Sequence, residues 1–328
     1  MHTQIFIIQE NGNPRMVLIW VFFLSGLWVW SSGLAAAPPA VPPMDTAAQS
    51  LPLPYFRVPQ PLTLCGEAVP LEDPVIREDL DREFTIVVWS RAQTTMWLKR
   101  AHRYFPEIEP KLRKRLLPLD LKYVVLVESD LRPKAKSPAG ALGFWQFMGP
   151  TAQRFQLKTG DAVDERLELG ASTDAALSYL QNLRKLLGNW PLALAAYNCG
   201  EGRVQREMAA QGVDNFYHLS LPEETERYIH RILAAKVVLE DPARYGYDIP
   251  QDQLYPPLSY EEVVFSVTQA VPVKRLADAC GSYYKTIKAL NPWIRGTSLP
   301  PGSYRLKVPK DAAGRFQEAY RQGRLVGG

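Results

Sequence analysis

The uneven placement of proline is the feature that most restricts how this chain can fold. The chain of 328 residues has 28 prolines, which are dense in residues 36–64 and recur in residues 246–258. Because proline removes a backbone donor and fixes φ, we interpret both stretches as extended linkers. They divide the chain into an N-terminal leader, a long central part and a small C-terminal module.

The composition is that of an ordinary globular protein. Hydrophobic residues make up 46% and charged residues 22%, which excludes a disordered, collagen-like or multi-span membrane protein. The net charge is only +4 and no basic cluster is present, so we expect no nucleic acid partner. Cys65, Cys199 and Cys280 lack the spacing of a zinc site. We expect no metal and no cofactor.

The N-terminus has the pattern of an export signal. Residues 16–30 form an apolar run that is shorter than the roughly 20 residues needed to span a bilayer. Small residues at Gly33 and Ala35 follow it, which predicts a signal peptide over residues 1–35 with cleavage after Ala35. Arg15 is the single basic residue before the run. The alternative is therefore an uncleaved membrane tether through residues 16–30.

Apolar residues recur at helical spacing through most of the central part, from about residue 79 to residue 240. The clearest segment is 173–187, which Gly188 should end as a C-cap. Asn189 should cap the next helix, and a last helix is expected over about residues 223–239.

Two central segments are harder to interpret. Pro106 and Pro110 are expected to break the helix that begins near Asp79, because proline interrupts helical hydrogen bonding. Residues 123–127 are rich in β-branched side chains, and by propensity they favour a strand.

The composition changes again after the second linker. Residues 259–312 predict a small βααβ unit: a strand, two short helices around Gly281, and a second strand after Asn291-Pro292. We expect residues 313–328 to be a polar tail.

Glu128 is the first candidate for chemistry, because it ends the apolar run 123–127. A carboxyl group against apolar surface is desolvated, which raises its pKa, and a general acid must be protonated near neutral pH. The ordinary alternative is a solvated carboxylate at the end of a helix or strand. A polar stretch with Ser137 follows, and then the cluster 145–148, whose aromatic rings next to an amide are typical of a sugar-binding surface.

At this point the chain resembles a known family, the family 1 lytic transglycosylases (SLT domain) with the goose-type lysozyme fold, and within it the membrane-bound lytic murein transglycosylase D group. The resemblance rests on four ordered motifs: Glu128-Ser129, Gly143-Phe144-Trp145-Gln146, Ala196-Tyr197-Asn198, and Glu224-Thr225 with Tyr228. Ser137, Gln146 and Met148 lie 9, 18 and 20 residues after Glu128, as in that family.

The resemblance covers about residues 65–245 and implies a fold that is mainly α, with a lysozyme-like helical catalytic domain. It implies that residues 123–127 are helical, against their propensity. The sequence departs from the family pattern at two sites. Phe144 stands where leucine is usual, and Ile229-His230 stands where Val-Pro is more usual. Neither departure removes Glu128.

The resemblance also implies a reaction, the cleavage of peptidoglycan between N-acetylmuramic acid and N-acetylglucosamine without water. Glu128 would protonate the glycosidic oxygen and then, as carboxylate, take the proton of the muramic C6 hydroxyl, which closes a 1,6-anhydro ring. Intramolecular attack has a high effective molarity, so one carboxylate suffices. Two alternatives stay open: a catalytically silent peptidoglycan-binding protein, and a lysozyme-type hydrolase. Such a hydrolase would use a second carboxylate, for which the candidates are Asp130, Asp164 and Glu165.

By the same resemblance, seven residues would bind substrate: Ser137, Trp145, Gln146, Met148, Tyr197, Asn198 and Tyr228. Trp145 and Met148 would form apolar walls, with core packing as the alternative. Tyr228 would lie near Glu128 and orient it.

Residues 259–312 resemble a LysM or LysM-like module, which implies binding of glycans that contain N-acetylglucosamine. A flexible linker would then raise the local concentration of substrate. Val271-Pro272-Val273 stands where Gly-Asp-Thr is usual, so a module that only packs on the catalytic domain is the alternative. We expect a monomer of the periplasm or cell envelope whose partner is the peptidoglycan strand.

Overall fold

The computed structural model describes residues 7–10, 13–16 and 54–325. The chain divides into two compact units, residues 1–53 and 54–328. In the first unit, strands β1 (Ile7–Glu10) and β2 (Asn13–Met16) pair antiparallel. The predicted signal peptide or tether lies outside the described residues, apart from these two strands. Among the described helices, none combines the length and the apolar character needed to cross a bilayer.

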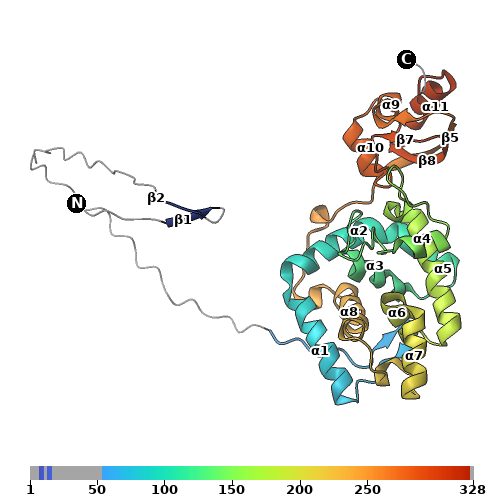
Figure 1. Ribbon diagram of the computed structural model, residues 1–328. Helices are drawn as coiled ribbons and strands as arrows, with labels where there is room; N and C mark the ends of the chain where they lie inside the picture. The colour runs from blue at the N-terminus through green and yellow to red at the C-terminus, as the bar shows by residue number, and fades with distance from the viewer. Residues whose placement is uncertain (1–6, 11–12, 17–53, 326–328) are drawn as a thin grey trace, which may run out of the picture. The chain divides into compact units, whose positions relative to one another are not determined.

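The larger part of the second unit is a helical domain around one hydrophobic core, which runs from Leu62 to Tyr247. Its helices are α1 (Pro74–Trp89), α2 (Arg91–Lys114), α3 (Lys122–Ser129), α4 (Gly149–Arg154), α5 (Leu169–Leu187), α6 (Trp190–Cys199), α7 (Glu201–Gln211) and α8 (Glu223–Glu240). Helix α8 lies in the middle and packs against α1, α3 and α6 (Figure 1). The expected mainly α fold class is confirmed.

Short elements precede, connect or follow these helices. They are β3 (Thr63–Leu64), β4 (Glu67–Ala68), and the 3-10 turns η1 (Leu119–Leu121), η2 (Glu165–Leu167), η3 (Phe216–His218), η4 (Ala243–Tyr245) and η5 (Gln251–Gln253).

The helix boundaries follow their caps. The Asn189 side chain accepts a hydrogen bond from the Leu192 N–H at 2.9 Å, as an N-cap of α6 should. Gly188 ends α5 in the left-handed conformation, with φ of 86°. Both predicted caps are confirmed. The start of α5 was predicted too late, because the Glu168 side chain caps it by accepting from the Ala171 N–H.

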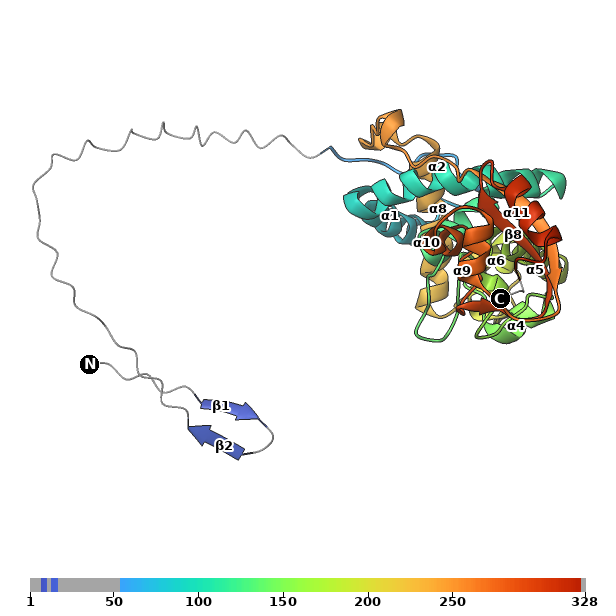
Figure 2. The same cartoon turned by 90° about the horizontal axis from the view of Figure 1, so that it is seen from above.

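The predicted break at Pro106 and Pro110 is wrong, because α2 continues through both prolines to Lys114. It runs along one edge of the domain in the view from above (Figure 2). An interior proline costs a helix about 3 kcal/mol. Side chains on one face of α2, among them Trp97 and Ile108, are buried in the core, and this burial offsets the penalty.

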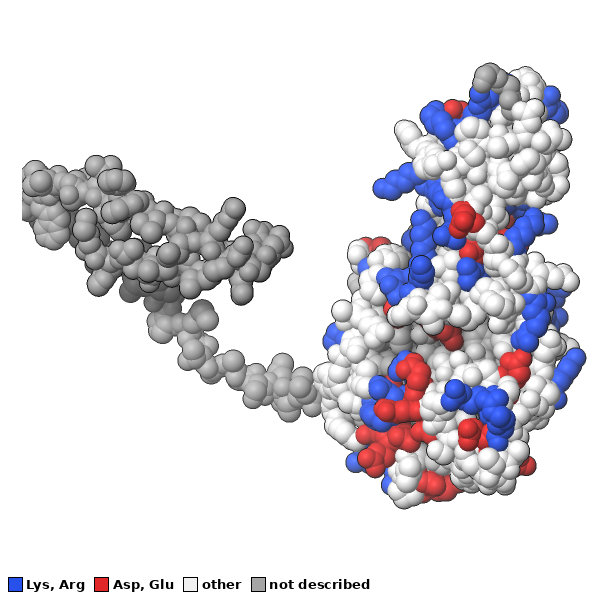
Figure 3. All heavy atoms as spheres, viewed as in Figure 1, with Lys and Arg blue, Asp and Glu red and all other residues white. Residues whose placement is uncertain are grey.

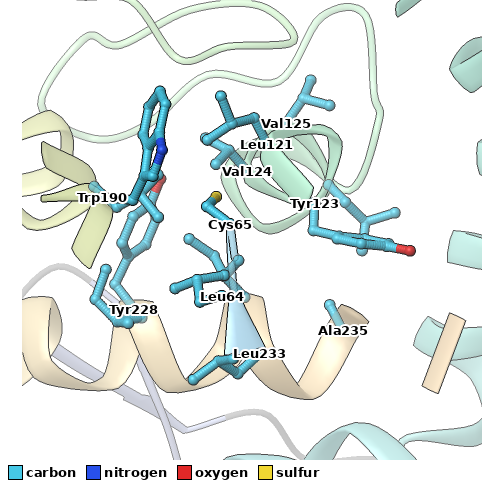
Figure 4. Close-up of a cluster of buried hydrophobic side chains, with 14 of the residues drawn as sticks. Leu64, Cys65, Leu121, Tyr123, Val124, Val125, Trp190, Tyr228, Leu233 and Ala235 are labelled. Carbon is cyan, nitrogen blue, oxygen red and sulfur yellow. The ribbon is translucent and has the colours of Figure 1, made fainter. Parts of the chain in front are cut away.

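Residues 123–127 lie inside α3, as the resemblance implied and propensity did not. Val124 and Val125 are fully buried. Figure 4 shows them on one side of the core and Leu233 of α8 on the other, with Leu64 between. Burial on every side makes a buried helix as favourable for these residues as a strand, so tertiary packing decides the conformation.

The C-terminal module has its own core. Strand β5 (Tyr260–Val267) pairs antiparallel with β8 (Gly302–Pro309), so that Tyr260 is opposite Pro309 and Val267 opposite Gly302. Between them lie β6 (Val271–Pro272), α9 (Val273–Ala279), α10 (Tyr284–Leu290) and β7 (Ser298–Leu299), and β6 pairs with β7. The expected βααβ order is present.

The expected polar tail from residue 313 is wrong. Residues Ala313–Arg321 form a helix, α11, that packs on β5. Phe316 and Ala319 are three positions apart, so they lie on one face and enter the core of the module. The charged residues of this helix, Arg315, Glu318 and Arg321, are exposed, which gave the segment its polar appearance in the sequence.

Residues 246–258 are not the flexible linker that their prolines suggested. Tyr247 is buried, and its hydroxyl donates to the Val88 carbonyl at 2.7 Å. Arg103 of α2 donates to the Pro256 carbonyl at 3.1 Å. Val163 pairs with Ile294 of the module, next to a hydrogen bond of 2.9 Å from the Asp164 N–H to the Trp293 carbonyl. The module is therefore held against the helical domain by a paired backbone.

Candidate active site

Glu128 lies one residue before the end of α3, and its carboxyl group is surrounded mostly by protein. The Tyr228 hydroxyl of α8 donates to Glu128 Oε1 at 2.6 Å. Burial raises the pKa of Glu128 to about 7, while the bond from Tyr228 lowers it, the charge of Glu224 raises it and that of Arg231 lowers it. A pKa near 7 leaves both the acid and the carboxylate populated at neutral pH.

The end of α3 places Glu128 by means of Asp130. Asp130 has a left-handed conformation with φ of 53°, and its N–H donates to the Leu126 carbonyl at 2.8 Å. Its carboxylate accepts from the indole N–H of Trp97 at 2.7 Å. This hydrogen bond fixes the turn after Glu128. It also engages the carboxylate of Asp130, which is the candidate second carboxylate nearest to Glu128 in the sequence.

The other two rival carboxylates are also engaged. Asp164 is fully buried and forms a two-pronged ion pair with Arg166, at 2.9 Å from Nε and 2.7 Å from Nη2. Glu165 accepts from the Lys158 N–H at 2.8 Å. Each of the three candidates thus holds backbone or side chains in place, and none of them contacts Glu128.

Two buried tyrosines lie near the carboxyl group, and one of them, Tyr228, donates a hydrogen bond to it. Tyr228 is only 2% exposed, and burial followed by the charge of Glu128 raises its pKa well above 10. The same two causes raise the pKa of Tyr197, whose hydroxyl donates to the Trp145 carbonyl at 2.8 Å. Both phenols stay protonated at any working pH, so Tyr228 acts on Glu128 as a donor. The prediction that Tyr228 lies against Glu128 agrees with this geometry.

The loop after Glu128 is closed by Gln146. Its amide nitrogen donates to the carbonyls of Ala135 at 3.0 Å and Gly143 at 2.7 Å. Gly143 has φ of 84°, and a Cβ there would lie 1.9 Å from the Arg166 carbonyl oxygen. No other residue fits at this position without moving the backbone. Gln146 is thus placed as a brace of the loop.

Trp145 does not form a wall for a substrate, and this prediction is wrong. Its side chain is 0% exposed, and its indole N–H donates to the Thr173 hydroxyl at 2.9 Å. A large aromatic ring next to apolar helices gains more free energy from core burial than from solvent exposure. Its contribution to the site is the backbone carbonyl that holds Tyr197.

Three predicted residues remain, namely Met148, Ser137 and Asn198. Met148 is 42% exposed and precedes α4. The Ser137 hydroxyl accepts from the Ala141 N–H at 3.0 Å, within its own turn. Asn198 accepts from the Thr225 hydroxyl of α8 at 2.8 Å. The structure therefore brings Tyr228 and Tyr197 toward Glu128 and leaves these three in contact with their local backbone or α8.

A buried ion-pair cluster between α1 and α8 was not predicted from the sequence. Glu83 of α1 is 1% exposed and accepts from Arg227 at 2.7 Å and from Arg231 at 3.3 Å. Arg231 in turn lowers the pKa of Glu128. The signal in the sequence was the spacing of four between the arginines, which puts both on one face of α8, but nothing in the sequence pointed to Glu83.

Within residues 54–325 and strands β1 and β2, no three His, Cys, Asp or Glu side chains come close enough together to hold a metal ion. Figure 3 shows acidic side chains gathered on the lower part of the helical domain and basic ones near the level of the C-terminal module.

Two family models match this chain. Residues 105–219 match the transglycosylase SLT domain, and residues 263–324 match the LysM-like domain of lytic transglycosylase MltD. Residues 105–219 therefore form an SLT domain, and residues 263–324 form an MltD LysM-like domain. The chain is similar to the membrane-bound lytic murein transglycosylase D of Escherichia coli (strain K12), to which it is 33% identical over 233 residues.

That alignment covers 69% of this chain and 51% of the relative, so the chain spans about half the length of the curated relative it matches. The soluble lytic murein transglycosylase of Salmonella typhimurium (strain LT2) is 35% identical over 116 residues, 33% of this chain and 18% of that protein. Among solved structures, the 70-kDa soluble lytic transglycosylase of Escherichia coli is similar at 20% identity and a TM-score of 0.38, over 62% of this chain and 40% of that one.

Proposed function

We propose that this protein is a peptidoglycan lytic transglycosylase that cleaves the β-1,4 bond between N-acetylmuramic acid and N-acetylglucosamine without water. The observation that carries the proposal is the pair of Glu128 and Tyr228, whose hydrogen bond of 2.6 Å holds a carboxyl group with a pKa of about 7. The SLT domain of residues 105–219 supports the same class of reaction.

Glu128 acts twice in this reaction. Its Oε1 already accepts a hydrogen bond from Tyr228, so the catalytic proton resides on Oε2, which protonates the glycosidic oxygen of the leaving sugar. The carboxylate then takes the proton of the muramic C6 hydroxyl, whose oxygen attacks C1 and forms the 1,6-anhydro ring. A pKa near 7 suits both steps, and the hydrogen bond from Tyr228 stabilises the carboxylate between them.

The three rival carboxylates considered from the sequence are engaged elsewhere, which removes each of them as the second carboxylate of a hydrolase. An inverting hydrolase needs a base that activates water, and a retaining one needs a nucleophilic carboxylate. Asp130, Asp164 and Glu165 are each bound to other groups. The C6 hydroxyl of the substrate itself replaces the second carboxylate, because its attack is intramolecular.

Ser137, Gln146, Met148, Tyr197 and Asn198 are the residues we assign to the sugar-binding surface around Glu128. Trp145 is left out of this group because its ring is buried. We further propose that the protein is exported to the periplasm or cell envelope, that it acts as a monomer, that residues 16–30 serve as signal or tether, and that the LysM-like module binds the glycan strand.

The test is the digestion of purified sacculi by the protein, by Glu128→Gln and by Glu223→Gln. Glu223 is an exposed residue of α8, so it controls for the same chemical change. Mass spectrometry should find products one water lighter than hydrolytic ones with the wild type and with Glu223→Gln, and none with Glu128→Gln. Full activity of Glu128→Gln would refute the assignment of Glu128 as the catalytic acid. An absence of products with the wild type would favour a catalytically silent binding protein.

A further inference from the structure

A cavity of about 500 Å³ lies where the C-terminal module meets the loop that follows Glu128. All the charged side chains that line it are cationic: Lys134, Lys136, Arg166, Lys288 and Arg295. Among the described residues no Asp or Glu lines this cavity, which we call the basic cavity. Its size is in the usual range for a small-molecule site.

The positive charge of the basic cavity is only partly balanced. Asp164, behind the wall, is paired with Arg166 at 2.7 Å and lies 3.7 Å from Arg295, so one buried carboxylate serves two guanidinium groups. The exposed Asp161 lies 3.9 Å from Arg295. Exposed charges at this distance contribute little.

The lysines of the basic cavity have no carboxylate partner within residues 54–325. Lys134 and Lys136 are exposed on the loop. The Lys288 ammonium donates only to backbone carbonyls, those of Ile294, Arg295 and Gly296. Burial lowers the pKa of Lys288, and the charge of Lys134 lowers it further. The two ammonium groups, one from each domain, therefore repel each other, and an anion between them would relieve this repulsion.

The basic cavity shares a loop with the proposed sugar site. Lys136 directly precedes Ser137 in the sequence and pairs with Leu142, which pairs with Phe147. Arg166 donates to the Phe147 carbonyl at 3.1 Å, one residue from the Gln146 brace. A substituent of a sugar bound on this loop would therefore lie near Lys134 and Lys136.

We propose that the basic cavity binds the carboxylates of the peptide stem that is attached to N-acetylmuramic acid. The proposal rests on the proposed function, since it concerns the same substrate. In an intact strand the lactyl carboxyl group of N-acetylmuramic acid is bound in the amide bond to the stem, so the sugars carry no ionised group, whereas the stem peptide carries several free carboxylates. Lysines hold such groups as point charges, and arginine holds them with its planar fork.

The LysM-like module contributes positive charge to this binding, because Lys288 and Arg295 come from it. The three N–H groups of Lys288 already donate to backbone carbonyls, so the direct contacts with a carboxylate fall to Lys134 and Lys136. The backbone of the module also fixes the wall, since the Arg295 N–H donates to the Ala162 carbonyl at 2.9 Å. The module would thus complete a peptide subsite for the catalytic domain in addition to any contact with glycan.

The test compares Lys134→Gln/Lys136→Gln with the control Lys114→Gln/Lys185→Gln, which removes the same charge from exposed lysines elsewhere. Cleavage is measured on strands with stem peptides and on strands stripped by an amidase, in which one lactyl carboxylate on the sugar takes the place of the several carboxylates of the stem. We expect the ratio of kcat/KM for peptide-bearing over stripped strands to fall about tenfold in the first variant, from two partly exposed ion pairs, and to be unchanged in the control. The ratio in the wild type should also fall with added salt.

A binding measurement separates this proposal from the proposed function. The probe is the free tripeptide alanyl-γ-glutamyl-diaminopimelate, titrated by calorimetry into the full chain and into both variants. Binding that is weakened in Lys134→Gln/Lys136→Gln alone supports the subsite. An unchanged affinity, or equal competition by inorganic phosphate, would overturn it and leave the reaction at Glu128 intact. A wild type that cleaves neither kind of strand would instead refute the proposed function.

Discussion

Replacing Tyr228 with phenylalanine removes one oxygen atom from the protein, the one that donates to Glu128 Oε1 at 2.6 Å. A hydrogen bond to a charged group contributes about 1.5–3 kcal/mol, and about 1.4 kcal/mol corresponds to one pH unit of pKa. The bond stabilises the carboxylate, so its loss should raise the pKa of Glu128 from about 7 by roughly one to two pH units.

The assay is the pH profile of kcat/KM on sacculi, whose alkaline limb reports the pKa of the acid in the free enzyme. The wild-type limb should fall near pH 7. In Tyr228→Phe it should move to higher pH while the maximum decreases, because the carboxylate needed in the second step is less stable and less well oriented.

The matched control is Tyr217→Phe. The Tyr217 hydroxyl is buried and has no hydrogen-bond partner within the described residues, so its removal should leave the limb in place. A limb that stays near pH 7 in Tyr228→Phe would refute the reasoning, because the hydrogen bond would then not control the ionisation of Glu128.

Two further predictions concern stability. Gly143→Ala should lower the free energy of unfolding by about 3 kcal/mol or more, because its Cβ would lie 1.9 Å from the Arg166 carbonyl oxygen; Gly149→Ala, where a Cβ meets nothing within 4 Å, should leave the thermal midpoint within a few degrees. Although burial works to raise it, the Lys307 ammonium holds the pKa of Glu168 below 4.5. Stability from Glu168 is therefore present above pH 4.5 and lost as the pH falls through the lowered pKa. Lys307→Met should weaken this acid dependence in thermal scans between pH 6 and 3, because only the Ala171 and Gly170 N–H groups then lower the pKa of Glu168; an unchanged dependence would assign it to other carboxylates.

The helices of the central domain were predictable where local chemistry decides them. Asn189 and Gly188 mark helix ends by hydrogen bonding and by left-handed conformation, which depend on a few adjacent residues. The prolines of α2 could not be judged locally, because the free energy that offsets them comes from the burial of Trp97 and Ile108 against distant parts of the chain.

Glu128 was found because its motif is specific, and its chemistry was predictable from the apolar run before it. The side chains that contact Glu128 could not be predicted from the residues near it in the sequence. The pairing of Tyr228 with Glu128 joins residues 100 positions apart, and only resemblance suggested it. Trp145 lies in a cluster of aromatic residues next to an amide, as in a sugar-binding surface. The sequence alone does not say whether such a ring is buried or exposed. The same limit hid Glu83, whose partners lie 144 and 148 positions away.

The docking of the C-terminal module was also hidden in the sequence. A segment rich in proline predicts an extended chain. Residues 246–258 contain the turn η5, and the carbonyls of Tyr255 and Pro256 are held by α2. Whether an extended segment is free depends on partners elsewhere in the chain. The pairing of Val163 with Ile294 is one such partner that no local pattern marks.

The central claim is that no water enters the products. Digestion of sacculi by the wild-type protein in water labelled with the heavy oxygen isotope tests it directly, with a hydrolytic lysozyme as the reference. The muramic ends released by this protein should carry no label and should be one water lighter than those from the reference. Labelled reducing ends would contradict the account, because they would mean that water, and not the C6 hydroxyl, attacks the sugar protonated by Glu128.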